Sequence, residues 1–200
     1  MLGLDLKVVR GWWSEHQYYQ AYFEMVAVGL LPVVFVGISH EPLSLYGFQR
    51  KGVLKSIVCS LSVVAIFYLK SFLATGQWIG YASFNTVVNP PWNFFHVLWG
   101  IFSNGPLEVF FFIWLVTKSD QILQGGTKIL STGFLGTTLL FGLLHIITTQ
   151  SLVNALNVFV IFFFLGLIYK WSRNIYGPIL GWTLINGMVW AYIELSGIIQ

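Results

Sequence analysis

Residues 129–169 read ILSTGFLGTTLLFGLLHIITTQSLVNALNVFVIFFFLGLIY, and His145 is the only side chain among them that titrates near neutral pH. A single α-helix of this length would reach about 60 Å, at about 1.5 Å per residue. The hydrocarbon core of a bilayer is only about 30 Å thick. We therefore expect the chain to fold back at residues 148–151, where four polar residues follow one another, and to form two membrane-spanning helices.

The composition of the whole chain is also that of a membrane protein. Of its 200 residues, 56% are hydrophobic and only 8% are charged, whereas soluble domains carry about 25% charged residues. So few charges cannot cover a soluble surface, which excludes a soluble globular domain and a disordered chain. The pI of about 9.0 reflects few basic residues, so it gives no reason to expect a nucleic-acid partner. The expected partner is the lipid bilayer.

Further apolar runs bring the expected number of spans to six. They are residues 22–38, 53–73, 92–116 and 175–193, each about long enough to cross a bilayer. The tripeptide Asn104-Gly105-Pro106 would kink or break the third, because proline removes a helical hydrogen-bond donor.

The sequence thus predicts an all-α fold with one integral membrane domain, residues 1–200. A polytopic transmembrane helix bundle of about six spans would occupy residues 22–193. Residues 1–20 mix charged and apolar side chains, which favours an amphipathic helix lying on the membrane surface.

Charge alternates between the expected loops. Basic residues occur in residues 40–52, 118–128 and 170–173, whereas the connections at 75–91 and 148–151 carry no charge. Cytoplasmic loops are enriched in Lys and Arg, so the three basic loops are expected to be cytoplasmic in a multi-pass protein. The two basic residues of the N-terminal segment count against this arrangement.

Glu108 and His145 are the two ionisable residues that lie deep within expected spans. A charge at mid-bilayer costs roughly 2.5–3.5 kcal/mol on insertion scales, so such residues need an explanation. Each alone could be structural, with Glu108 protonated and hydrogen-bonded and His145 a neutral polar link between helices. Because they lie on adjacent spans, a shared functional site is the favoured interpretation.

The last span carries Asn186, with Trp182 four residues earlier on the same helix face. Asn186 alone is typical of a residue that links helices by a hydrogen bond. Gly177 and Gly181 form a G-x-x-x-G pair, which predicts the close approach of a neighbouring helix.

Three of these positions match motifs of a known family. Phe141-Gly142-Leu143-Leu144-His145 matches the pattern Phe-x-x-x-His. Glu108 matches the first residue of Glu-Glu-x-x-x-Arg, and Asn186 matches the last residue of His-x-x-x-Asn. In the order and placement of these motifs the chain resembles the CPBP intramembrane proteases, which include the type II CAAX prenyl endopeptidases and bacteriocin self-immunity proteins. The resemblance covers roughly residues 40–190.

The chain departs from the family motifs at three positions. Val109 stands in place of the second Glu, Ile113 in place of Arg, and Trp182 in place of the last His. Trp has one N–H donor and does not bind metal. Metal binding and catalysis are the two properties that these departures affect.

The resemblance implies roles for the residues that remain. Glu108 would be the general base, His145 would orient the attacking water directly or through a metal, and Asn186 would donate to the oxyanion. Phe141 would fix the imidazole, and Trp182 would line the site. The implied cofactor is a divalent metal such as zinc, with Glu108 and His145 as its ligands.

Two functions from different classes follow. The first is a glutamate-dependent intramembrane endopeptidase, a hydrolase of the metalloprotease type that acts on membrane-associated peptides. The second is a non-catalytic pseudoenzyme of the same fold, which would bind a membrane partner or serve as a self-immunity protein. A small transporter is disfavoured, because the chain lacks paired half-helices in two matching halves.

Overall fold

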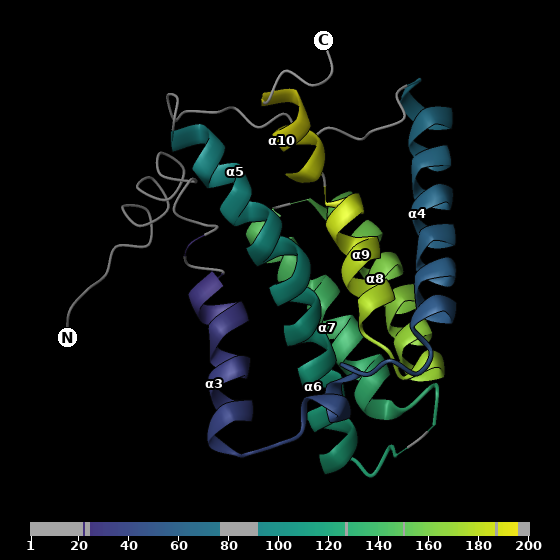
Figure 1. The fold of residues 1–200 in the computed structure, drawn as a ribbon. Helices are drawn as coiled ribbons and strands as arrows, with labels where there is room; N and C mark the ends of the chain where they lie inside the picture. Colours follow the sequence, from purple (N-terminus) through teal and green to yellow (C-terminus); the bar gives the residue numbers. More distant parts are fainter. Residues whose placement is uncertain are drawn as a thin grey trace, which may run out of the picture.

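The computed structural model describes residues 22, 25–76, 92–126, 128–149, 151–186 and 188–195, and no strand occurs among them. The expected interfacial helix at residues 1–20 and most of the connection 75–91 lie outside the described residues. Figure 1 shows the helices as a bundle. In chain order the elements are η2 (Met25–Leu30), α3 (Leu31–Ile38), η3 (Leu43–Tyr46), α4 (Val53–Thr75), α5 (Trp92–Phe102), η4 (Ser103–Leu107), α6 (Glu108–Ile122), α7 (Thr132–Thr149), α8 (Leu152–Ser172), α9 (Tyr176–Ile185) and α10 (Met188–Leu195).

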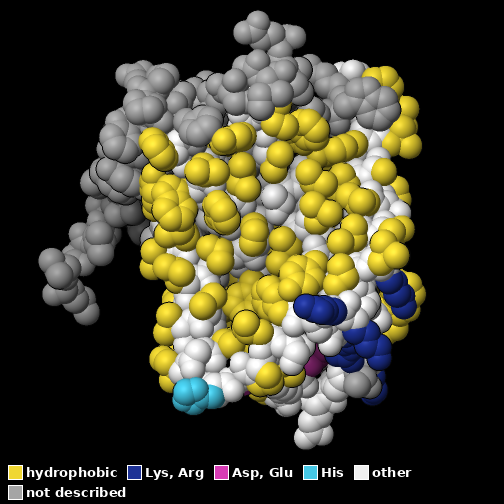
Figure 2. Space-filling model, viewed as in Figure 1, with side chains coloured by type: hydrophobic (Ala, Val, Ile, Leu, Met, Phe, Trp, Pro, Cys, Tyr) yellow, Lys and Arg dark blue, Asp and Glu magenta, His cyan; other side chains and the backbone are white. Residues whose placement is uncertain are grey.

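Three helical segments are long and apolar enough to cross a membrane: Val53–Thr75, Val97–Ile122 and Leu152–Ser172. Their outer faces carry large apolar side chains, such as Leu54 and Leu73 on α4, each 76% exposed. Apolar side chains cover most of the face in Figure 2. Exposed apolar surface on this scale requires lipid rather than water around it. The chain is therefore an integral membrane protein with an all-helical bundle.

The predicted fold-back of residues 129–169 is confirmed. Helix α7 ends at Thr149 and α8 begins at Leu152. The Ser151 hydroxyl accepts a hydrogen bond from the backbone N–H of Asn154 at 3.2 Å, which caps the start of α8.

Two expected spans differ from the structure. The third expected span passes through the π-helical turn η4, which contains Pro106, and its helix then continues past residue 116 to Ile122. A wider turn accommodates a residue that cannot donate a backbone hydrogen bond.

The prediction of one helix over 175–193 is wrong, because α9 ends at Ile185 and α10 begins at Met188. Asn186 caps α9 and is followed in the sequence by glycine, and both residues are poor helix formers. An average over an apolar window does not register this short interruption.

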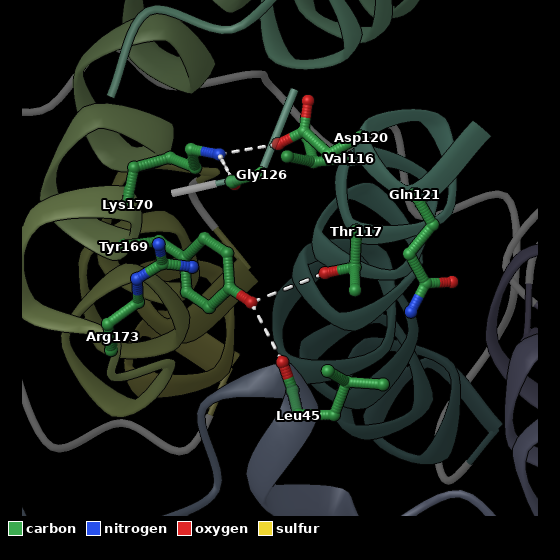
Figure 3. A pocket seen from close by; sticks show the side chains of 9 residues that line it. All are labelled: Leu45, Val116, Thr117, Asp120, Gln121, Gly126, Tyr169, Lys170 and Arg173. Carbon is green, nitrogen blue, oxygen red and sulfur yellow. Dashed lines mark hydrogen bonds and ion pairs between the residues drawn. The ribbon is translucent and has the colours of Figure 1, made fainter. Parts of the chain in front are cut away.

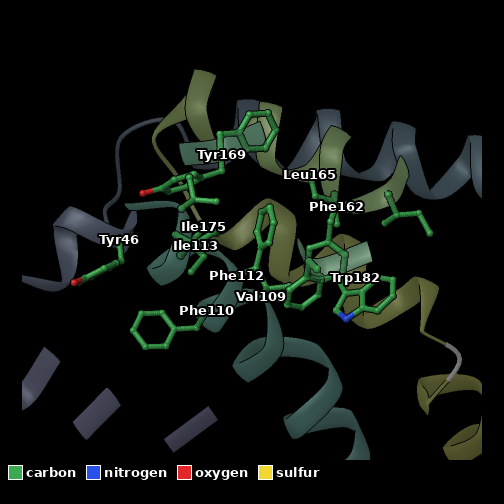
Figure 4. Packing of buried hydrophobic residues seen from close by; sticks show 14 of the residues in the cluster. Tyr46, Val109, Phe110, Phe112, Ile113, Phe162, Leu165, Tyr169, Ile175 and Trp182 are labelled. Atoms are coloured by element: carbon green, nitrogen blue, oxygen red, sulfur yellow. The ribbon is translucent and has the colours of Figure 1, made fainter. Parts of the chain in front are cut away.

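The core lies where α6, α7, α8 and α9 meet, and aromatic side chains dominate it. Phe112 packs edge-to-face against Phe162, with ring centroids 4.9 Å apart, and Phe141 packs against Phe162 at 4.5 Å. Figure 4 shows Trp182 and Phe162 side by side in this cluster. These rings form a rigid apolar layer beneath the polar residues of α6, α7 and α9.

Candidate active site

Glu108 is the first residue of α6, directly after the π-helical turn η4. Single π-helical turns within α-helices are frequent at functional sites, because they re-aim the side chains that follow. The Glu108 side chain is only 14% exposed. The sequence therefore places a carboxylate inside the bundle, where apolar side chains surround it.

His145 comes from α7, and its ring faces Glu108. Its Nδ1 lies 2.9 Å from the backbone oxygen of Phe141. A carbonyl oxygen only accepts hydrogen bonds, so Nδ1 carries a proton. The other ring nitrogen, Nε2, lies 3.6 Å from Oε1 of Glu108. Phe141 also packs its ring 5.3 Å from the imidazole, so this one residue contacts His145 through both its backbone and its side chain.

Trp182 from α9 holds the other oxygen of the same carboxylate. Its indole Nε1 donates a hydrogen bond to Oε2 of Glu108 at 2.7 Å. The ring is 7% exposed and lies 4.7 Å from the Phe162 ring, edge to face. The sequence identified Trp182 as a residue that lines the site, but its bond to Glu108 was not predicted. The two positions are 74 apart in the sequence, so no local pattern indicates this contact.

Asn186 lies one turn beyond Trp182 on the same helix. Its Nδ2 donates a hydrogen bond of 2.5 Å to the backbone oxygen of Asn104 in η4. Asn104 precedes Glu108 by one helical turn. Asn186 therefore contacts the same long helix as Trp182 does, one turn N-terminal to Glu108. The structure thus brings Glu108, His145 and Trp182 into one cluster and places Asn186 next to it.

The substituted positions of the first motif point elsewhere. Val109 is 1% exposed and Ile113 is fully buried, and both belong to the apolar core. No polar group enters the site from these two positions. Among the residues that the structure describes, the polar side chains shown to meet in the cluster are those of Glu108, His145 and Trp182.

The donor set does not fit an ordinary catalytic zinc site, which has three protein ligands. Glu108 Oε1 and His145 Nε2 are the two metal-binding atoms that face each other, and the neighbouring indole binds no metal. Among the described residues, no three His, Cys, Asp or Glu side chains come together. A divalent metal at Glu108 and His145 remains a prediction that follows from the resemblance.

The comparisons with known proteins agree with the motifs. The family model described as Type II CAAX prenyl endopeptidase Rce1-like matches residues 90–188. This range includes the three residues of the cluster, Glu108, His145 and Trp182, and also Asn186 beside it. No curated protein and no solved structure matches the chain. Residues 90–188 are therefore similar to the Rce1-like domain of type II CAAX prenyl endopeptidases, in agreement with the sequence motifs.

Proposed function

We propose that the chain is an intramembrane endopeptidase that cleaves membrane-associated peptides, with Glu108 as its general base. The observation that supports this most is the largely enclosed pair of Glu108 Oε1 and His145 Nε2, 3.6 Å apart on two helices of the range that matches the Rce1-like family model. A titratable pair enclosed by apolar helices is expensive to keep in a membrane and is a typical mark of a functional site.

The geometry of the pair suits the activation of water. The separation is too long for a strong direct hydrogen bond, but one water molecule could contact both atoms at ordinary distances. With the proton of His145 on Nδ1, Nε2 is an acceptor. Such a water would donate one hydrogen to Nε2 and one to Oε1, which leaves an oxygen lone pair free to attack.

The proposed reaction then follows general acid–base chemistry. The water oxygen bonds to the carbonyl carbon of the substrate as Glu108 accepts a proton from the water. When the C–N bond breaks, Glu108 returns that proton to the leaving amine. Trp182 keeps the carboxylate oriented by its N–H group, and the Asn186 amide is the proposed donor to the oxyanion.

The proposed substrates reach the site from the bilayer, so topology is part of the proposal. We propose six spans, with the basic loops 40–52, 118–128 and 170–173 in the cytoplasm. Figure 2 shows Lys and Arg side chains gathered at one end of the bundle, which supports this arrangement.

The second candidate is a non-catalytic protein that binds a membrane peptide, a pseudoenzyme of the same fold. One observation favours it: the indole of Trp182 already occupies one oxygen of Glu108, at the position where the family has a histidine. A site that lacks this histidine could retain a peptide without cleaving it.

A reporter peptide embedded in liposomes together with the purified protein distinguishes the two candidates. An endopeptidase releases two fragments, which mass spectrometry identifies, and the Glu108→Gln variant releases none. A binding protein leaves the peptide intact but co-purifies with it from detergent, and Glu108→Gln lowers this retention little. Fragments that Glu108→Gln releases at the wild-type rate would contradict the proposed mechanism.

A further inference from the structure

A second polar site lies at the other end of α6, about 20 Å along the helix from Glu108. It is a cavity of about 150 Å³ between α6, α8 and η3, which we call the basic-end pocket. The residues that matter to the argument are Thr117, Gln121, Gly126, Tyr169, Lys170 and Arg173 (Figure 3). It shares no residue with the candidate active site.

The inner wall of the pocket contains a buried ion pair. Lys170 on α8 donates to Asp120 on α6 and to the backbone oxygen of Gly126, and the two charged side chains are 2% and 8% exposed. Lys has three N–H donors, and these contacts use two of them. A buried ion pair is often no more stable than an apolar pair of the same size, so its presence calls for a reason beyond stability.

The Tyr169 hydroxyl forms the middle of the pocket and is fully engaged by the protein. It donates to the backbone oxygen of Leu45 at 3.2 Å and lies 3.3 Å from the Thr117 hydroxyl. These contacts hold α8, α6 and η3 at fixed positions around the cavity. Hydrogen bonds within the protein therefore fix the frame of the pocket.

Two further donors stand at the mouth of the pocket. Arg173 ends α8 with a left-handed backbone (φ 54°), and its backbone oxygen accepts a bond of 2.6 Å from Gln49 Nε2. Figure 3 shows the Arg173 guanidinium and the Gln121 amide on opposite sides of the Tyr169 hydroxyl. The opposite charges of Lys170 and Asp120 cancel, so the lining has a net charge of +1, which comes from Arg173. Such a lining is complementary to a small anion with several acceptor oxygens.

The size and location of the pocket limit which anions it can bind. Ligand pockets for drug-sized molecules enclose about 300–1,000 Å³, so a cavity of about 150 Å³ admits only a small group. The pocket lies at the end of the molecule where basic side chains gather (Figure 2). Nearby, Lys55 Nζ lies 2.9 Å from the centroid of the exposed Trp171 ring, and Trp is typical of the membrane interface. Phospholipid phosphates also lie at the membrane interface, and basic pockets between spanning helices bind anionic headgroups.

We infer that the basic-end pocket binds the phosphate of an anionic phospholipid headgroup. Arg173 contacts the phosphate oxygens from one side and Gln121 from the other, and the remaining N–H of Lys170 reaches them from the inner wall. The inference does not depend on peptide cleavage at Glu108.

Lipid nanodiscs test this inference on the full-length protein. Thermal unfolding is measured in nanodiscs of phosphatidylcholine alone and with added phosphatidylglycerol, and native mass spectrometry measures which lipids remain bound. We expect phosphatidylglycerol to raise the unfolding temperature of the wild type and to co-purify with it. Arg173→Gln should bind phosphatidylglycerol about tenfold more weakly, which corresponds to about 1.4 kcal/mol. Gln121→Ala should weaken binding in the same direction.

Arg50→Gln is the matched control, because it removes one exposed positive charge outside the pocket. It should retain wild-type binding of phosphatidylglycerol. Equal losses in Arg50→Gln and Arg173→Gln would overturn the inference, because they would show diffuse attraction to the membrane surface. Equal stabilisation by both lipids would also overturn it. Inorganic phosphate that reproduces the whole effect in phosphatidylcholine nanodiscs would replace the lipid by a free anion.

Discussion

At the scale of single residues, position 182 decides how the candidate active site differs from the family pattern. An indole N–H stands where the family has an imidazole, and it donates to Glu108 Oε2 at 2.7 Å. A hydrogen bond to a carboxylate oxygen fixes the orientation of the carboxylate. Trp182 can therefore position Glu108, but it cannot act as a proton acceptor or metal ligand.

Two substitutions at this position separate donation from packing. Trp182→Phe keeps an aromatic ring against Phe162 but removes the N–H, and hydrogen bonds to charged groups contribute about 1.5–3 kcal/mol. We expect a lower unfolding temperature and slower peptide cleavage. Trp182→His restores the donor of the family motif, and we expect faster cleavage than in the wild type. Cleavage that is equally fast in Trp182→Phe and the wild type would show that the indole does not position Glu108.

Part of this site could be predicted from the sequence, since Glu108 and His145 are the deep ionisable residues of adjacent spans. The sequence predicts that they share a site, and the structure places Glu108 Oε1 and His145 Nε2 3.6 Å apart. The bonds of Trp182 and Asn186 to the long helix were not predictable, because they depend on how α9 packs against η4 and α6. The buried Lys170–Asp120 pair escaped for the same reason, since its members are 50 residues apart.

At the scale of secondary-structure elements, glycines set the distance between α4 and α9. A Cβ atom at Gly177 would overlap the backbone oxygen of Ser56, and one at Gly181 would lie 3.3 Å from the Ser60 Cβ. The close approach predicted from the G-x-x-x-G pair is thus confirmed. This contact positions Trp182, which is on the same helix.

Gly177→Ala should therefore push α9 away from α4. Backbone atoms cannot move aside as a flexible side chain can, and overpacking of this kind typically costs about 1–3 kcal/mol. We expect a clear fall in the unfolding temperature in detergent. Gly136→Ala is the control, because a Cβ atom at this position would have no neighbouring atom within 4 Å. An equal effect of both substitutions would contradict this account of the α4–α9 contact.

A polar link joins the connection after α3 to α6. Glu41 accepts hydrogen bonds from Lys118 and from the Tyr46 hydroxyl. The bond from Lys118, followed by that from Tyr46, holds the pKa of Glu41 below its usual value of 4.5. Burial and the bond to Glu41 raise the pKa of Tyr46, so this hydroxyl stays protonated and keeps donating.

The sign of the pH dependence follows from the lowered pKa of Glu41. A group with a depressed folded-state pKa stabilises the protein above its unfolded pKa, and this stabilisation is lost as pH falls through the folded pKa. We expect the wild type to unfold at a higher temperature than Glu41→Gln at neutral pH. The difference should shrink as pH falls below about 4.3, the usual pKa of Glu, and vanish once the pH is below the lowered pKa of Glu41. Unfolding scans of both proteins across pH measure it. A difference that stays constant down to strongly acid pH would refute the ionic link.

At the scale of the whole molecule, the apolar runs of the sequence determine the main features of the fold. The helical class, the fold-back at residues 148–151 and the membrane location could be predicted from these runs, because the hydropathy of a segment depends only on the residues that it contains. The break between α9 and α10 and the continuation of α6 to Ile122 depend on local capping and tertiary contacts. Apolar averages do not contain that information.

The topology can be tested by cysteine labelling in a Cys59→Ala background. Lys51→Cys and Leu123→Cys should react with an impermeant reagent only from the cytoplasmic side, and Asn85→Cys only from the opposite side. Gly52 and Gly125 lie in the same loops but are poor sites for a cysteine. A Cβ atom at Gly52 would lie 2.6 Å from Ser172 O, and one at Gly125 would lie 2.5 Å from Asp120 Oδ1. Reaction of all three cysteines from one side would refute the six-span arrangement.

The measurement that tests the central claim most directly is the single-turnover rate of reporter-peptide cleavage in liposomes. It compares the wild type, Glu108→Gln and Glu41→Gln, well below the unfolding temperature of each protein. Both substitutions replace a hydrogen-bonded carboxylate by an amide, but only one lies at the site beside His145. We expect Glu108→Gln to be slower by about 10² to 10⁴, the usual contribution of a general base, and Glu41→Gln to cleave at nearly the wild-type rate. Cleavage by Glu108→Gln at the wild-type rate would contradict the assignment of Glu108 as the general base.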